Sequence, residues 1–312
     1  MSDLTTSTAS VLSAVDLSKL PFPPDLIPRA SEAVLAEMVA DVRAYYRQKT
    51  GQDLIVHEAD PAYVAIEACA YRRHKDLLDY QSQVKNMLVA YAAGAWLDHL
   101  GANPDFKCTR LVIVPADDST NPPTPAVMEP DDAYRARMVL SNEGYTTAGT
   151  VGANLFFTLS ADGDIRDASV QSPAPCDVLL TVLTWSNNGA ATTALLRKIE
   201  AVFANERLRS PCDAYTAQSA KITAYSVVLN ITSYPGVDVP DLIARARASV
   251  EAHCAAHFRL GHDITLSGLI AAATVLGVQK VSVVSPTADL ICDLSSACRC
   301  SSVVINHVGV AL

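Results

Sequence analysis

Hydrophobic residues near the start of the chain recur every three to four positions, which is the period of an amphipathic helix. Residues 31–51, SEAVLAEMVADVRAYYRQKTG, predict such a helix, with Ser31 as the N-cap and Gly51 at the C-terminal end. Its charged side chains face away from one apolar stripe. The stripe consists of Val34, Leu35, Met38, Val39 and Val42.

A second, longer helix is predicted from the Asp60-Pro61 pair, where Asp is a helix cap and Pro occupies the first helical position. No breaker interrupts residues 61–93, a length of about 50 Å as a straight helix. A helix of this length seldom packs within one small domain. It more often connects two domains or packs in a helix bundle. Residues 95–102 then predict a short helix that ends near Gly101 and contains a buried Trp96.

The pattern changes after residues 115–130, PADDSTNPPTPAVMEP, which carry five prolines and no hydrophobic period. Beyond them, strand-like and helix-like segments alternate. Residues 150–173 and 265–286 share one plan: a helix, a short turn, an alternating strand and a terminal Ser-Pro. The predicted fold class is α+β, an N-terminal helical arm followed by two small mixed α/β sheet modules. The predicted parts are a flexible N-terminus (1–20), a helical arm (21–114), a Pro-rich linker (115–130), a first module (131–220) and a second module (221–312).

Composition narrows the functional classes. The net charge is −9 with no cluster of Lys or Arg, and aromatic residues make up 6%, which argues against binding of nucleic acid. The first residues resemble no secretory signal, and the longest apolar runs are shorter than the roughly 20 residues that cross a bilayer. We therefore expect a soluble protein made in the cytoplasm, with no contact to a membrane.

Residues 253–263, HCAAHFRLGHD, are the first candidate for chemistry. His253 and His257 lie one helical turn apart, as zinc ligands often do, with Cys254 between them and His262 after a turn. The stretch lacks the Glu of an HExxH motif. A zinc hydrolase built on these histidines would therefore have no general base. The competing interpretation is a solvated helix end, where His interacts favourably with the helix dipole.

The remaining candidates are weaker. Cys298 and Cys300 would face the same side of a strand, and Cys292 precedes them, but no second cysteine pair completes a zinc site. Without a secretory signal we expect all eight cysteines to be free thiols. The acidic runs 129–132 and 161–164 do not fit a calcium loop and predict a helix cap and a turn. No nucleotide-binding or Ser-nucleophile motif is present, so we expect neither catalytic residues nor a cofactor.

Several ordered motifs resemble the baseplate J-like family, the wedge components of contractile phage tails and related particles. They are DPAY (60–63), AYAAGAWLDHL (90–100), EGYTTAG (143–149) and the two strand units that end in Ser-Pro, and the resemblance spans roughly residues 20–310. It implies a structural protein of the tail baseplate in the virion. It also implies three kinds of partner: a small wedge protein with a lysozyme-like fold, a tail protein I-like component, and further copies of the chain in a ring around the tail hub. His262 departs from the RLGRD pattern that we associate with the turn, and cysteines 254, 298 and 300 belong to no family motif.

Three hypotheses follow. The leading one is a baseplate wedge protein, assembled in the host cytoplasm. Its arm binds other wedge chains through Val34, Leu35, Met38 and Val42 and through the long helix 61–93. The alternative is a metal-dependent enzyme that uses His253 and His257, with His262 or Cys254. A third is a carbohydrate-binding tail module, for which only Trp96 and Trp185 are available.

Overall fold

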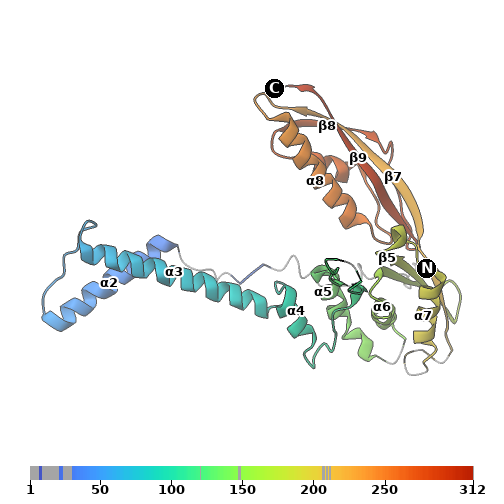
Figure 1. The fold of residues 1–312 in the computed structure, drawn as a ribbon, viewed down its shortest axis with the longest axis horizontal. Helices are drawn as coiled ribbons and strands as arrows, with labels where there is room; N and C mark the ends of the chain where they lie inside the picture. Colours follow the sequence, from blue (N-terminus) through green and yellow to red (C-terminus); the bar gives the residue numbers. More distant parts are fainter. Residues whose placement is uncertain are drawn as a thin grey trace. The chain divides into compact units, whose positions relative to one another are not determined.

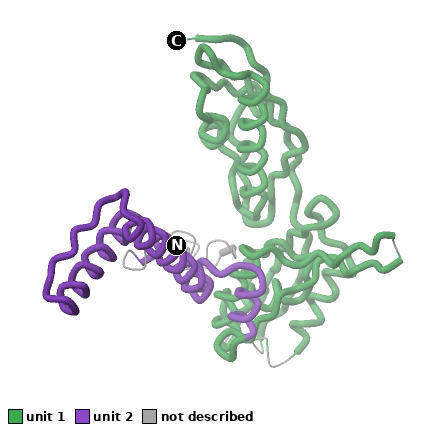
Figure 2. The backbone as a smooth tube through the Cα atoms, turned by 60° about the vertical axis from the view of Figure 1, so that its left-hand side comes forward, with its two compact units in different colours: residues 1–14, 103–312 green, residues 15–102 purple. Residues whose placement is uncertain are grey.

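The fold comes from a computed structural model that describes residues 7–8, 21–23, 30–119, 121–146, 149–205, 208, 210 and 212–311. The chain divides into two compact units, one of residues 1–14 and 103–312 and the other of residues 15–102 (Figure 2). Figure 1 labels the helices and strands. The fold class is α+β, as the sequence predicts.

The unit of residues 15–102 is helical. Helix α2 (Ser31–Thr50) and helix α3 (Pro61–Met87) pack side by side as a hairpin, and α4 (Gly94–Gly101) follows (Figure 1). Gly51 ends α2 in the left-handed conformation with its N–H on the Arg47 carbonyl, as the sequence predicts, whereas the N-cap is Ala30 instead of Ser31. Few side chains are buried in this unit: Val34, Val56, Ile66, Ala70, Ala92 and Leu97.

Two predictions about this unit are wrong in detail. Helix α3 ends at Met87 instead of continuing to Gly94, because Leu88 adopts an extended conformation and the following turn buries Ala92. Neither proline nor glycine marks this end in the sequence, so the predicted helix is too long. Trp96 is 52% exposed, and its neighbour Leu97 is the buried residue of α4.

Residues 115–130, predicted as a linker, lie within the larger unit. Strand β3 (Val127–Met128) pairs with β2 (Val112–Val114), and Asp117 bridges Thr124, so four of the five prolines lie in the connection of a small hairpin. The boundary between the two compact units falls earlier, between Ala102 and Asn103.

A first sheet follows, in the order β1-β4-β5-β6. Its strands are β1 (Ser7–Thr8), β4 (Ile165–Gln171), β5 (Asp177–Thr184) and β6 (Ala214–Ser219), with β5 and β6 parallel and the other pairs antiparallel. The accompanying helices are α5 (Asp131–Leu140), α6 (Val151–Ser160) and α7 (Thr193–Phe203), with the 3-10 turns η3 (Glu143–Tyr145) and η4 (Asn187–Gly189). Leu155, Leu180 and Ile199 form the centre of its core. Apart from Ser7–Thr8, the predicted flexible segment 1–20 lies outside the described residues.

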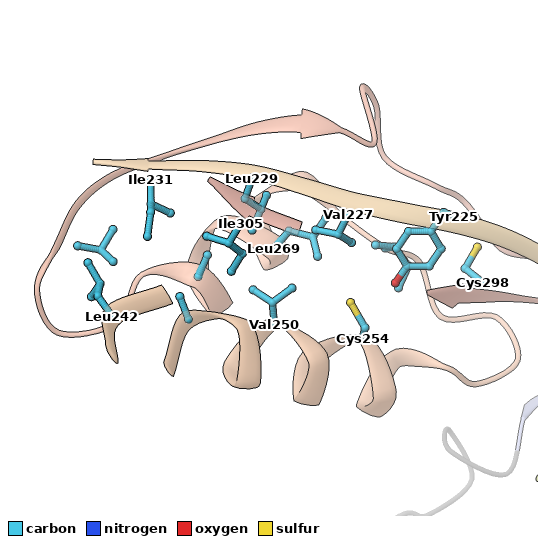
Figure 3. Packing of buried hydrophobic residues seen from close by; sticks show 14 of the residues in the cluster. Tyr225, Val227, Leu229, Ile231, Leu242, Val250, Cys254, Leu269, Cys298 and Ile305 are labelled. Atoms are coloured by element: carbon cyan, nitrogen blue, oxygen red, sulfur yellow. The ribbon is translucent and has the colours of Figure 1, made fainter. Parts of the chain in front are cut away.

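The second sheet has the order β8-β7-β9. Strand β7 (Lys221–Ser233) lies between β8 (Val278–Ser285), which is antiparallel, and β9 (Ser296–Val310), which is parallel. Helices α8 (Val239–His257) and α9 (Leu266–Ala273) pack on the sheet. Figure 3 shows the core between α8 and the sheet, where Val250 and Leu242 meet Val227, Leu229 and Ile231.

The repeat predicted from the sequence is present in both sheet regions. Helix α6 leads to β4, and α9 leads to β8. Each helix begins after a threonine, Thr150 or Thr265, whose side-chain oxygen accepts an N–H from the residue three positions on. No described helix is both long and apolar enough to span a membrane.

The two sheet regions contact each other through β4. The buried Asp167 accepts the backbone N–H of Leu260 at 3.0 Å, and Ser169 donates its hydroxyl to the carbonyl of Leu294 at 2.5 Å. The Arg166 guanidinium lies 4.6 Å from the Trp185 ring and 4.9 Å from the Phe258 ring. Both faces of β4 are therefore covered, one by its own core and one by the second region.

Candidate partner-binding surface

Exposed hydrophobic side chains are dense on the helical unit. Tyr45 is 62% exposed, Ile55 76%, Tyr71 70% and Met87 68%, although the unit has only six buried hydrophobic residues among those described. Large exposed side chains in this number mark a surface that another protein covers. The others on this unit are Val42, Tyr46, Val64, Leu78, Tyr80, Leu88 and Trp96.

Three of these side chains form one stripe along α3. Val64, Tyr71 and Leu78 follow one another at intervals of seven residues, so each lies two helical turns from the next with a drift of about 20°. The buried residues Ile66 and Ala70 occupy another face, which packs in the α2–α3 hairpin. A seven-residue apolar repeat is the pattern that a second helix covers in a coiled coil. Helix α3 thus has one face that packs within its own unit and one whose apolar side chains are 43–70% exposed.

The four residues predicted as a partner interface on α2 differ in exposure. Val34 is only 5% exposed and belongs to the core of the helical unit. Leu35 and Met38 are half-buried, and Val42 is 36% exposed. The sequence pattern identified the apolar stripe of α2, but it could not separate the part that packs internally from the part that remains open. The exposed stripe of α3 was not predicted, although its interval of seven was visible in the sequence.

The histidines of the alternative hypothesis do lie together. His253 and His257 are on α8 with their ring centroids 4.1 Å apart, and the His262 ring lies 6.0 Å from that of His257. Nδ1 of His257 lies 2.9 Å from the backbone carbonyl of His253, so one of its two ring nitrogens is engaged. Burial and the neighbouring His257 lower the pKa of His253. The rings of His253 and His257 are tilted by 35° and those of His257 and His262 by 70°, and the described residues contain no group of three or more His, Cys, Asp or Glu side chains placed to hold a metal.

The acidic runs have structural partners. Asp131 and Asp132 occupy the first turn of α5, as predicted, and Asp162 receives the Lys198 ammonium at 2.7 Å. Glu129 was not singled out by the sequence. It is buried and forms an ion pair of 2.6 Å with the buried Arg137. Arg137 also donates to the carbonyl of Thr109, so this pair holds the β2–β3 hairpin on α5.

The two tryptophans of the third hypothesis lie in different parts of the chain. Trp96 belongs to the helical unit and Trp185 to the larger one. Trp185 is half-buried, and the Arg166 guanidinium lies over its ring. All eight cysteines are free thiols.

Two comparisons with known proteins identify the family. The family model of the Baseplate J-like N-terminal domain matches residues 58–117, a range that includes α3 and α4. The chain is 38% identical over 290 residues to baseplate protein J of Escherichia phage P2, and the match covers 92% of this chain and 95% of the phage protein. A match of this identity over nearly the full length of both chains shows that the protein belongs to the baseplate J-like family of phage tail baseplate components.

Proposed function

We propose that the protein is a structural wedge component of the baseplate of a contractile phage tail or tail-like particle, and that its helical unit binds helices of other wedge proteins. The single observation that carries this proposal is the exposed stripe of Val64, Tyr71 and Leu78 on α3. Burial of each such side chain contributes roughly 1.5–3 kcal/mol before the costs of association are subtracted. A partner helix that covers the stripe therefore offsets part of the cost of association, and the other exposed apolar side chains of the unit add to this.

The partners that fit are the ones implied by the family. They are a small wedge protein with a lysozyme-like fold and a tail protein I-like component, both contributing helices to a bundle with α2 and α3. Val42, with Tyr45 and Tyr46, extends the exposed apolar surface along α2. Leu35 and Met38 lie at its half-buried border.

The two sheet regions, 131–220 and 221–312, have a separate role in this proposal. They join neighbouring copies of the chain into a ring around the tail hub. The particle assembles in the host cytoplasm, and the finished protein resides in the virion. No step of this function requires a catalytic residue, a metal or a cofactor.

The experiment is co-expression of the tagged chain with the other tail proteins of its particle, followed by purification and electron microscopy. The double variant Tyr71→Asp/Leu78→Asp should lose most of the co-purifying wedge proteins, because two charges would be buried without partners. Ala65→Asp/Gln83→Asp is the matched control, since it adds the same two charges at exposed positions of α3 away from the stripe. A double variant that assembles as fully as the control would contradict the proposal for this surface.

A further inference from the structure

A pocket of about 280 Å³ is lined by residues of β4, α8 and β9. Two of its lining residues are arginines, Arg166 from β4 and Arg299 from β9, and one is an acid, Glu251 from α8. Phe258 and Val303 add apolar atoms to the lining. The pocket therefore combines two guanidinium groups with an apolar wall.

A β-bulge in β9 shapes one side of this pocket. The pairing of β9 with β7 shifts by one residue between Cys300 and Ser302, so Ser301 has no register partner on β7. In a regular strand neighbouring side chains point to opposite faces, whereas residues 299–303 all line this pocket. The bulge therefore brings consecutive residues of one strand to one site, an arrangement that bulges often serve.

The Arg166 side chain is already fixed in the structure. Its guanidinium lies 4.6 Å from the centre of the Trp185 ring and 4.9 Å from that of the Phe258 ring, and it donates to the carbonyl of Ala255 at 2.6 Å. This is its only hydrogen bond among the described residues, so most of its five N–H donors are left for a ligand. Because stacking already restricts the side chain, Arg166 loses little conformational entropy when it binds an anion.

The positive charge of the pocket is not neutralised within the part of the chain that the structure describes. No described acid forms an ion pair with Arg166 or Arg299. Burial and the charge of Arg259 lower the pKa of Arg166, and the charge of Asp167 opposes them. These three arginines, set against Asp167 and Glu251, leave a local excess of one positive charge. The local charge thus matches a ligand with a single negative charge.

The charge and size of the pocket favour a carboxylate over a phosphate. Guanidinium groups bind both anions through paired hydrogen bonds. A phosphate group carries nearly two negative charges at neutral pH, whereas a carboxylate carries one. The pocket volume lies just below the range of ordinary small-molecule sites, which begins at about 300 Å³. A carboxylate on a short apolar body, in contact with Phe258 and Val303, therefore fits best.

We propose that this pocket binds one carboxylate group carried on a short apolar body. Arg166 and Arg299 donate paired hydrogen bonds to its oxygens, while Phe258 and Val303 contact its carbon atoms. Glu251 repels a second negative charge and thereby selects a monoanion. The carboxylate belongs to a free organic acid or to a glutamate side chain of a neighbouring protein. The site involves no residue of the helical unit, so the proposal is independent of the wedge function.

The test is a titration of the full chain, followed by calorimetry and by NMR of isotope-labelled arginine side chains. The probes are butyrate, its neutral analogue butyramide, inorganic phosphate and a blocked glutamate, N-acetylglutamate methylamide. Butyrate should bind with a Kd on the order of 1 mM and shift the side-chain signals of Arg166 and Arg299. Butyramide and phosphate should bind at least about tenfold more weakly. Tighter binding of the blocked glutamate than of butyrate would identify a protein side chain as the ligand, and the reverse order a free acid.

Variants separate this pocket from a general attraction of anions. Arg299→Gln should raise the Kd for butyrate at least about tenfold. Arg247→Gln is the matched control and should leave the Kd unchanged, since it removes the same charge from an exposed position of α8 outside the pocket. Glu251→Gln should lower the Kd about threefold or more and admit phosphate, because it removes the negative charge beside the arginines.

Circular dichroism shows whether each variant is folded, and the exposed Glu251 keeps the test decisive if the Arg299 variant misfolds. The proposal is overturned if neither butyrate nor the blocked glutamate binds, or if butyramide binds as tightly as butyrate. Equal binding by folded Arg299→Gln and Arg247→Gln variants would overturn it too, as would weaker binding by Glu251→Gln.

Discussion

Asp167 makes the stability of the larger unit depend on pH. Its carboxylate is buried where β4 meets the second sheet region and accepts the backbone N–H groups of Ala168 and Leu260 at 2.9 and 3.0 Å. Burial is the largest influence and raises the pKa of Asp167 from 3.8 to about 6, although the two hydrogen bonds and the charges of Arg166 and Arg259 oppose it. The folded protein therefore binds a proton here that the unfolded chain releases near pH 4.

The sign and size of the effect follow from this difference. Because the pKa is higher in the folded state, protonation favours folding. The contribution is fully present below about pH 4 and is lost as the pH rises to 6. A shift of about two pKa units corresponds to roughly 3 kcal/mol at 1.36 kcal/mol per unit. Between pH 4 and pH 7, Asp167 should thus lower the free energy of unfolding by that amount.

The variant Asp167→Asn isolates this group, since an amide does not titrate in this range. Urea unfolding is followed by fluorescence in a Trp96→Phe background, where Trp185 beside Arg166 is the only tryptophan. The stability of the Asp protein relative to the Asn variant should fall by roughly 3 kcal/mol from pH 4 to pH 7. Any constant cost of replacing a carboxylate oxygen by an NH₂ group cancels in this comparison. Parallel pH curves for the two proteins would refute the reasoning.

Two further buried positions test packing in the larger unit, each with an exposed position as its control. Glu129→Ala should lower the free energy of unfolding by roughly 3–5 kcal/mol, because it leaves the Arg137 guanidinium buried without its carboxylate. Asp132→Ala, which removes an acid that is 92% exposed, should cost less than about 1 kcal/mol in the same urea titration. Equal losses for the Glu129 and Asp132 variants would contradict a stabilising role of the Glu129–Arg137 ion pair. Leu155→Ala should cost roughly 2–5 kcal/mol, since Leu155 is fully buried. Leu276→Ala, at 89% exposure, should stay within about 0.5 kcal/mol, and a larger loss would indicate that Leu276 packs in solution.

The sequence predicted the helices and strands of this fold wherever the signal came from neighbouring residues. Pro61 at a helix start, Gly51 at a helix end and the threonines 150 and 265 before α6 and α9 all act within one or two turns of themselves. The α+β class and the repeat of helix, turn and strand follow from the same short-range signals. The end of α3 at Met87 does not follow from such signals. It is decided by the burial of Ala92, and no proline or glycine marks it in the sequence.

The candidate sites were predicted less completely, for the same reason. The sequence grouped His253, His257 and His262 because they are neighbours along the chain. The structure places their rings side by side at an angle, without a metal-binding arrangement among the described residues. It treated Cys254 and Cys300 as separate thiols, because no local pattern relates residues of α8 and β9. Only the parallel pairing of β9 with β7, and the packing of α8 on that sheet, brings both residues to the lining of one pocket.

Family membership, the order of elements and the amphipathic character of the arm were thus determined by the sequence itself, since periodicity and caps are properties of neighbouring residues. Tertiary structure decided which apolar face is covered and which is open, as with Val34 inside the helical unit and Tyr71 outside it. It also decided the environment of Asp167 and Ser169, whose partners Leu260 and Leu294 are distant in the chain. Burial and pKa depend on everything that surrounds a group in space, and a linear pattern records only its neighbours along the chain.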